Sequence, residues 1–232
     1  MRIVQVVLLL FWFSASSQTD FAAAEDLFLH GNYEASRLLF EEVVEKHPRN
    51  FKALEYIGDS YSHMQQWEQA VPVYARLKNA VSSDVYLYKY GGALAMHARN
   101  GSKLRALSLV PDIREAFEAA IRLNPSQIDA RWALIELYLQ LPTWAGGSES
   151  KALQYAKALL AVSVVDSYLA NARIAEHYKR FYSAADFYQK AIKAGGSVAC
   201  YTKLADLYIH KLKQPQRAKQ LLAHINNQKR KQ

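Results

Sequence analysis

One pattern of apolar and small residues recurs along most of the chain. In each copy an apolar residue is followed, in most cases, by a small one, and an aromatic or apolar residue stands three positions later. The copies are Ala23-Ala24-Leu27, Ile57-Gly58-Tyr61, Tyr90-Gly91-Leu94, Leu134-Ile135-Tyr138, Ile174-Ala175-Tyr178 and Leu204-Ala205-Tyr208. The last residues of successive copies are 34, 33, 44, 40 and 30 positions apart. Self-similarity at such a spacing predicts structural repeats, each containing a helix with a small residue where backbones approach closely.

A second pattern alternates with the first. A residue that is usually small is followed by a larger one four positions later, and by an apolar one three positions beyond that. The copies are Ser36/Phe40/Val43, Ala70/Tyr74/Leu77, Ile113/Phe117/Ala120, Ala152/Ala156/Leu159, Ala184/Tyr188/Ala191 and Ala218/Leu222/Ile225. Spacings of four and three place all three residues on one face of a helix. The chain is therefore predicted to alternate two kinds of helix, one with a small residue and one that inserts a ring beside it.

The segments between the predicted helices agree with such pairs. The turns "HGNYEA" and "HMQQWEQA" hold the aromatic residues Tyr33 and Trp67, and Pro48 and Pro125 end second helices because proline cannot continue a helix. The spacing, the Gly-x-x-Tyr and Ala-x-x-x-Tyr signatures and these prolines resemble the tetratricopeptide repeat family over roughly residues 19–225. The resemblance implies an all-α, right-handed superhelical solenoid of about six antiparallel helix pairs, whose first helices line a concave binding surface.

Two intervals exceed the usual repeat length. The first holds "HARNGSKLRALSLVPDIREAF". Its Arg-Asn-Gly-Ser segment predicts the end of a helix, and residues 103–110 predict an extra turn or a short helix. Pro111 with Asp112 predicts the start of the next helix, because proline is favoured at the first helical position.

The second interval holds "LPTWAGGSESKAL", an insert between two predicted helices. The insert is predicted to end one helix at its proline, to use its glycines for conformations that other residues avoid, and to cap the next helix with Ser148 or Ser150. Trp144 either packs on the neighbouring repeat or contributes to a ligand-binding loop with Gly146 and Gly147, and we expect packing. The insert resembles a segment of bacterial exported repeat proteins through Pro142, Gly146, Gly147, Ser148, Lys151 and Ala152.

The beginning of the chain predicts export. Arg2 precedes an apolar run over residues 3–13 and then several small residues, which are the parts of a secretory signal peptide, assigned to residues 1–17. An uncleaved membrane anchor is the alternative, but a spanning helix needs about 20 apolar residues and this run is about a dozen. Residues 18–225 then form the repeat domain, and the expected location is the bacterial periplasm.

Charge is distributed unevenly. The formal net charge is +8, and the predicted C-terminal tail, residues 226–232, contains three basic residues and no acid. The tail is either a solvated end or a segment that binds anionic lipid, cell-wall polymer or an acidic protein face. Nucleic acid is not an expected partner of an exported protein.

No catalytic, cofactor-binding or metal-binding motif is present in the sequence. It lacks H-E-x-x-H, G-x-S-x-G, a Walker loop and paired cysteines, and its seven histidines show no tight pair at metal-ligand spacing. Cys200 is the only cysteine, and its helical context favours a buried side chain over a free thiol. We therefore expect no enzymatic activity, no cofactor and no metal.

The predicted concave surface is the candidate binding site. Helical spacing places on it a set of side chains, called the groove residues: Tyr56, Asp59, His63, Tyr88, Lys89, Trp132, Glu136, Arg173, Glu176, Lys203 and Asp206. Aromatic rings among mixed charges are typical of peptide-binding surfaces. Alternatively, several of these side chains are partly buried between repeats and the charges only solvate the face. The predicted function is that of an exported adaptor or scaffold that binds a protein or peptide. The alternative is an envelope-associated structural protein held by its basic C-terminus.

Overall fold

The structure, a computed structural model, describes residues 20–195 and 197–229, with side chains described as far as Ala223. The predicted signal peptide lies outside these residues. Every regular element of the described chain is helical, as the sequence predicts. Among the described helices, none is both long and apolar enough to cross a membrane. The chain divides after Leu123 into two compact units, which are described separately.

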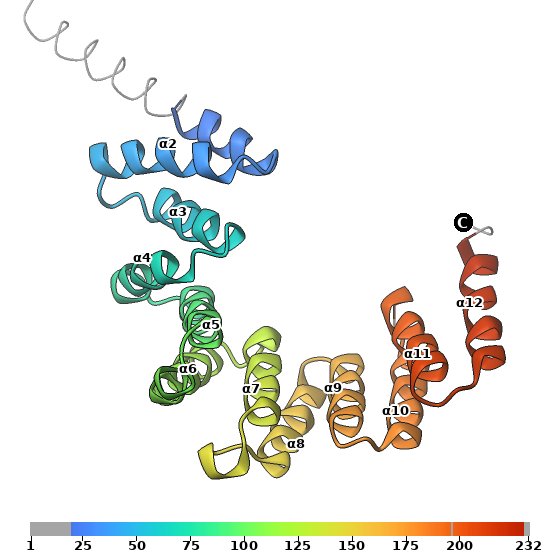
Figure 1. Cartoon of the computed structure of the whole chain (residues 1–232). Helices are drawn as coiled ribbons and strands as arrows, with labels where there is room; N and C mark the ends of the chain where they lie inside the picture. The colour runs from blue at the N-terminus through green and yellow to red at the C-terminus, as the bar shows by residue number, and fades with distance from the viewer. Residues whose placement is uncertain (1–19, 196, 230–232) are drawn as a thin grey trace, which may run out of the picture. The chain divides into compact units, whose positions relative to one another are not determined.

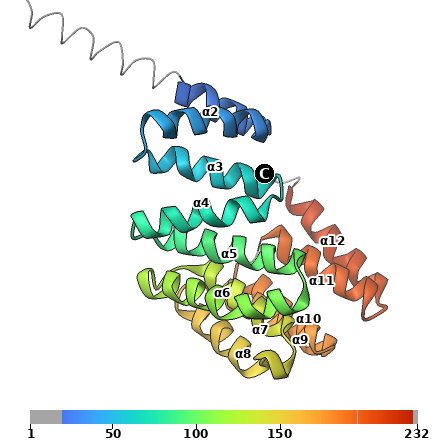
Figure 2. The same ribbon diagram turned by 60° about the vertical axis from the view of Figure 1, so that its left-hand side comes forward.

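Unit 1 consists of three antiparallel helix pairs (Figure 1), and Figure 2 shows α2 to α5 stacked in chain order. Its helices are residues 20–29, α2 (Tyr33–Lys46), α3 (Phe51–His63), α4 (Trp67–Ala80), α5 (Asp84–Asn100) and α6 (Lys103–Leu123). Unit 2 also contains three pairs. Its elements are α7 (Ile128–Gln140), η1 (Thr143–Ala145), α8 (Glu149–Ala158), η2 (Leu159–Ala161), α9 (Val164–His177), α10 (Phe181–Lys193), α11 (Val198–His210) and α12 (Pro215–Lys229). The described residues thus contain six helix pairs, and α12 extends into the predicted tail.

The two sequence patterns correspond to the first and second helices of the pairs. Gly58 of α3 is buried against Tyr74 of α4, and a β-carbon on Gly58 would lie 2.7 Å from that ring. Gly91 of α5 meets Phe117 of α6 in the same way, at 2.9 Å. The small residues therefore lie where rings of the second helices insert, as predicted, and packing at these places is close. The predicted burial of Cys200 is also confirmed.

The turns within two of the pairs are short and built alike. Residues 64–66 join α3 to α4, and residues 178–180 join α9 to α10. Gln65 and Lys179 occupy the left-handed region there, with φ of 58° and 57°. This conformation reverses the chain direction within three residues and starts the second helix at once. Trp67 is the first residue of α4, so the aromatic residue of this turn begins the second helix.

The helix after the first long interval begins earlier than predicted. α5 ends at Asn100, as the Asn-Gly segment predicts, but α6 begins at Lys103 and continues through Pro111. The predicted helix start at Pro111 is therefore wrong. Ser102 explains the earlier start, because its side-chain oxygen accepts a hydrogen bond from the Arg105 N–H at 3.4 Å and caps the helix. Pro111 is exposed, and its missing N–H removes only one backbone hydrogen bond from the helix.

Candidate functional site

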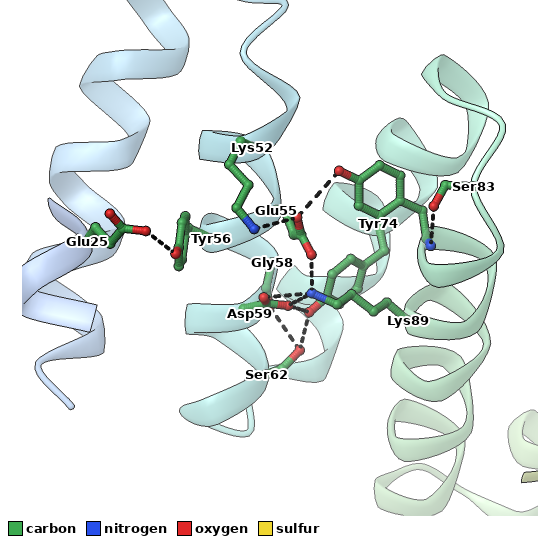
Figure 3. Close-up of polar contacts among 11 residues, drawn as sticks. Glu25, Lys52, Glu55, Tyr56, Gly58, Asp59, Ser62, Tyr74, Ser83 and Lys89 are labelled. Atoms are coloured by element: carbon green, nitrogen blue, oxygen red, sulfur yellow. Dashed lines mark hydrogen bonds and ion pairs between the residues drawn. The ribbon is translucent and has the colours of Figure 1, made fainter. Parts of the chain in front are cut away.

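In unit 1 the groove residues Asp59 and Lys89 form an ion pair between consecutive first helices (Figure 3). Lys89 Nζ of α5 lies 2.7 Å from Asp59 Oδ2 and 2.6 Å from Glu55 Oε1, both in α3. The Tyr74 hydroxyl of α4 donates to Asp59 Oδ1 at 2.6 Å. One carboxylate thus accepts from the second helix of its own pair and from the first helix of the next pair, and it links three helices.

Burial and hydrogen bonding set the protonation of this cluster. Burial raises the pKa of Glu55, but the hydrogen bond and the charge of Lys89 lower it more, so the pKa lies below its ordinary value. Burial raises the pKa of Tyr74, and the charge of Asp59 raises it further. At neutral pH Glu55 is therefore ionised, and Tyr74 keeps the proton that it donates.

The other groove residues of unit 1 are engaged in contacts between helices. The Tyr56 hydroxyl donates to Glu25 Oε1 at 2.6 Å, and this hydrogen bond raises the pKa of Tyr56 to about 12. The His63 ring stacks on Tyr33 with ring centroids 4.3 Å apart. The Tyr88 ring lies 5.9 Å from a phenylalanine ring of α6. The structure therefore brings Asp59 and Lys89 together but holds Tyr56, His63 and Tyr88 elsewhere.

Sequence reasoning missed three members of the unit 1 cluster. Glu55 lies one helical turn before Asp59, and this spacing of four was a usable signal that both face Lys89. Tyr74 was recognised only as a core ring, and its hydroxyl contact depends on tertiary packing. The Ser62 hydroxyl, 3.0 Å from that of Tyr74, completes the cluster in the same way.

Unit 2 repeats the arrangement with an arginine. Arg173 of α9 donates from Nε to Glu136 Oε1 at 2.8 Å and from a terminal nitrogen to Oε2 at 2.9 Å, which makes the pair bidentate. Trp132 Nε1 donates to Asp166 Oδ1 at 2.9 Å and adds a second link between α7 and α9. In both units the carboxylate follows the second residue of its copy of the first sequence pattern, and the cation precedes the first residue of the next helix's copy. We call this series of contacts the ladder.

One pair further along, the ladder positions are Glu176 of α9 and Lys203 of α11. Glu176 accepts a hydrogen bond from the Tyr188 hydroxyl of α10, as Asp59 does from Tyr74. Burial raises the pKa of Tyr188, and the bond to Glu176 raises it further. Lys203, however, forms no ion pair with any residue that the structure describes. The ladder positions form ion pairs at Asp59–Lys89 and Glu136–Arg173, but not at Glu176–Lys203. We call this third position the open place.

A cleft of about 330 Å³ lies at the open place in unit 2. Its lining residues are Arg173, Glu176, Tyr188, Lys203, Asp206, Leu207, His210 and Lys211. Four of these are predicted groove residues, so here the structure does bring them together. Sequence reasoning missed Tyr188, Leu207, His210 and Lys211. His210 follows Asp206 by four positions, and helical spacing alone could have placed it on the same face.

The insert joins α7 and α8 within one helix pair. Its first part is the 3₁₀ turn Thr143–Ala145, after which Gly146 takes a φ of +98° that disfavours other residues. Gly147 is closely surrounded, because a β-carbon there would lie 1.9 Å from the Leu141 carbonyl oxygen. Gly146 therefore has the conformational role that the sequence predicts, whereas Gly147 is required by the close approach of the backbone instead.

The structure answers two questions about the insert: which serine caps α8, and whether Trp144 packs on the neighbouring repeat. Ser148 caps α8, because its hydroxyl accepts a hydrogen bond from the Lys151 N–H at 3.3 Å. Trp144 is 79% exposed, so the expectation that it packs on the neighbouring repeat is wrong. The loop closes through its own backbone instead: the N–H groups of residues 145 and 147 donate to the Pro142 carbonyl at 2.9 and 3.0 Å. It needs no side chain packed beneath it.

Known proteins resemble the chain in one sequence segment and in the fold. Residues 21–84 match the tetratricopeptide repeat family. No curated protein matches the chain in sequence. TTC0263, a thermophilic TPR protein of Thermus thermophilus, is similar in structure with a TM-score of 0.63 and 18% identity, over 83% of this chain and 99% of its own. PilW, a widely conserved type IV pilus biogenesis factor, has a TM-score of 0.64 and 14% identity, over 91% of this chain and 93% of its own.

A third structure is that of YrrB, a TPR protein with an unusual peptide-binding site. Its TM-score is 0.53 at 16% identity, over 78% of this chain and 87% of its own. Identities this low carry the fold and nothing finer. The chain therefore matches the tetratricopeptide repeat family in sequence over residues 21–84, and both of its units have the helix-pair fold of TPR proteins.

Proposed function

We propose that this protein is an exported, non-enzymatic adaptor that binds a protein or peptide segment at the cleft between α9 and α11. The observation that carries the proposal is the open place in the ladder. At the equivalent positions the cations Lys89 and Arg173 are neutralised by carboxylates of the preceding helix. Lys203 and Asp206 are exposed, and neither has an ion-pair partner among the described residues.

The chemistry of the cleft favours a polypeptide over a small apolar molecule. Lys203 offers donors and Asp206 offers acceptors within one cleft, and the buried Leu207 lies beneath them in its lining. An extended peptide presents both kinds of backbone group together with charged side chains, so it can satisfy both signs at once. The peptide-binding site named for YrrB supports a role of this class for the fold. The alternative of an anionic envelope surface gains no support from the described residues.

Crosslinking with matched charge variants tests the cleft. Purified protein carrying a crosslinker would be incubated with envelope extract, and its partners identified by mass spectrometry. We expect the double variant Lys203→Glu, Asp206→Lys to lose the partner that the wild-type protein captures. Lys157→Glu is the control, since Lys157 is also an exposed lysine of unit 2 but lies on the second helix α8. Capture of the same partner by the cleft variant would refute the assignment.

Export is tested independently of the partner. The proposal of a periplasmic location rests on the apolar segment and small residues within residues 1–17. When the whole chain is expressed in a bacterium, it should appear in the periplasmic fraction with a new N-terminus near residue 18. Recovery of the chain from the cytoplasm with Met1 retained would overturn the location and leave the binding proposal intact.

A further inference from the structure

Unit 2 has a second exposed surface, made of residues other than those of the cleft. We define the turn edge as Trp144, Glu149, Tyr178, Arg180 and Tyr182. An ion pair between Arg180 and Glu149 joins the α9–α10 turn to the start of α8. Figure 1 shows the α7–α8 and α9–α10 turns at the same end of their helices. Trp144 and Tyr182 are 79% and 73% exposed, so this end of the helices presents two large aromatic side chains to solvent.

The residues that carry Trp144 are not needed to close their helix pair. Three residues suffice between α3 and α4 and between α9 and α10, whereas eight, residues 141–148, join α7 to α8. None of the eight is buried, so they add no side chain to the core. Their backbone is nonetheless well bonded, and the Ser148 N–H donates to the Tyr138 carbonyl at 3.1 Å. Because this longer insert is ordered by its own backbone bonds, its exposed tryptophan is preorganised and would lose little conformational freedom in a contact outside the fold.

The charges around the turn edge indicate the chemistry of its partner. Within three residues of the two turns lie Lys151, Lys179 and Arg180 against two acids, Glu149 and Glu176, and Glu176 is already bonded to Tyr188 at the cleft. The whole of residues 124–232 shows the same excess, with 16 Lys and Arg against 7 Asp and Glu. Tryptophan, tyrosine and arginine are the residue types that contribute most to binding at protein interfaces. A complementary surface has an apolar pocket for the indole and carboxylates around that pocket.

We propose that the turn edge docks a protein whose surface offers an apolar pocket bordered by acidic side chains, with Trp144 as the anchor. An anionic membrane is the competing occupant of an aromatic and basic surface. The edge has too few cations for that occupant: Lys151, Lys179 and Arg180 lie near it, and Arg180 is paired with Glu149, whereas basic surfaces that bind anionic lipid gather about four to eight Lys and Arg. At a protein surface the pair of Glu149 with Arg180 can remain at a solvated rim, where it costs little.

Selection of peptides on the whole protein tests this proposal. Short random peptides displayed on phage would be selected on the immobilised chain, and the enriched sequences made as synthetic peptides. We expect enriched peptides to combine apolar residues with Asp or Glu and to change the tryptophan emission that is lost in Trp144→Phe. Trp144→Ala should weaken their binding by about tenfold or more.

Two controls separate the turn edge from other surfaces. Leu104→Ala removes a side chain that is 82% exposed in unit 1, and it should leave peptide affinity unchanged. Lys203→Glu, which damages the proposed cleft, should also leave it unchanged, so failure of one proposal is distinguishable from failure of the other. Peptides that bind Trp144→Ala as tightly as wild type, or a selection without acidic enrichment, would overturn the inference. A shift of Trp144 emission with phosphatidylglycerol vesicles and not with peptides would assign the edge to membranes.

Discussion

Two adjacent glycines of α5 allow the packing argument to be tested with a built-in control. A β-carbon on Gly91 would lie 2.9 Å from the Phe117 ring and 3.1 Å from the Ala116 β-carbon, whereas one on Gly92 would meet nothing within 4 Å. Both glycines are in the interior of the same helix. Replacing each by alanine changes the helix propensity equally, and only Gly91→Ala changes the packing.

The helix-propensity gain and the overpacking cost together set the sign of each variant's change in the free energy of unfolding. Alanine is favoured over glycine within a helix by about 1 kcal/mol, so Gly92→Ala should stabilise by about that amount. At Gly91 the same gain is opposed by overpacking against a buried ring, which costs about 1–3 kcal/mol. Gly91→Ala should therefore be neutral or destabilising by up to about 2 kcal/mol. The difference between the two variants, about 1–3 kcal/mol, no longer contains the propensity contribution.

Urea unfolding followed by circular dichroism measures this difference. Helical repeats can unfold in parts, so hydrogen exchange of the α5 amides should accompany the unfolding curve and report the local free energy. Phe117→Leu makes room beside Gly91, and in that background Gly91→Ala should be less harmful than in the wild type. Equal stabilisation by the two alanines would show that the Phe117 ring moves aside at no cost, and it would refute close packing at Gly91.

Three further perturbations test a ladder contact, the Tyr56–Glu25 hydrogen bond and the insert. Lys89→Met should destabilise unit 1 by about 1–3 kcal/mol at neutral pH, because it leaves half-buried carboxylates uncompensated. The pKa of Glu55 is lowered in the folded state. The stabilisation by its ion pair with Lys89 is therefore present above pH 4.5, the ordinary pKa, and is lost as the pH falls through the lower pKa of the folded protein. Urea midpoints measured across acid pH test this loss. The pKa of Tyr56 is raised from 10.0 to about 12, so wild-type stability should fall across that range, and Tyr56→Phe should flatten the alkaline fall. Gly147→Ala should lower the thermal midpoint more than Gly146→Ala. The new β-carbon at position 147 would collide with backbone, whereas at position 146 it meets no atom and only the left-handed conformation is disfavoured, by about 1 kcal/mol.

The helix pairs were predictable because their cause is local. Small residues such as Gly58 and rings such as Tyr74 recur at helical spacing, and this periodicity survives insertions between the helices. The start of α6 was not predictable from Pro111, because a proline favours a helix start only when no earlier cap competes. Trp144 was misplaced for a related reason. Sequence spacing shows that the insert is longer than a turn, but whether its side chains pack depends on backbone bonds that the loop makes with itself.

The groove residues show where prediction of a site must stop. Helical periodicity placed Lys89, Arg173 and Lys203 at the same position of three first helices, directly before the first residue of each pattern copy. Asp59 and Glu136 likewise share the position of the carboxylate. Periodicity could not show that Asp59 and Arg173 are neutralised within the fold while Lys203 is not, because pairing depends on which side chains the neighbouring helices bring opposite. A neutralised position links consecutive pairs and adds rigidity, whereas the same position without a partner is available to an outside ligand. In this protein the repeat position therefore does not determine the role of a charged residue. Its pairing state does, and that is why the proposed binding site lies between α9 and α11 rather than along all the first helices.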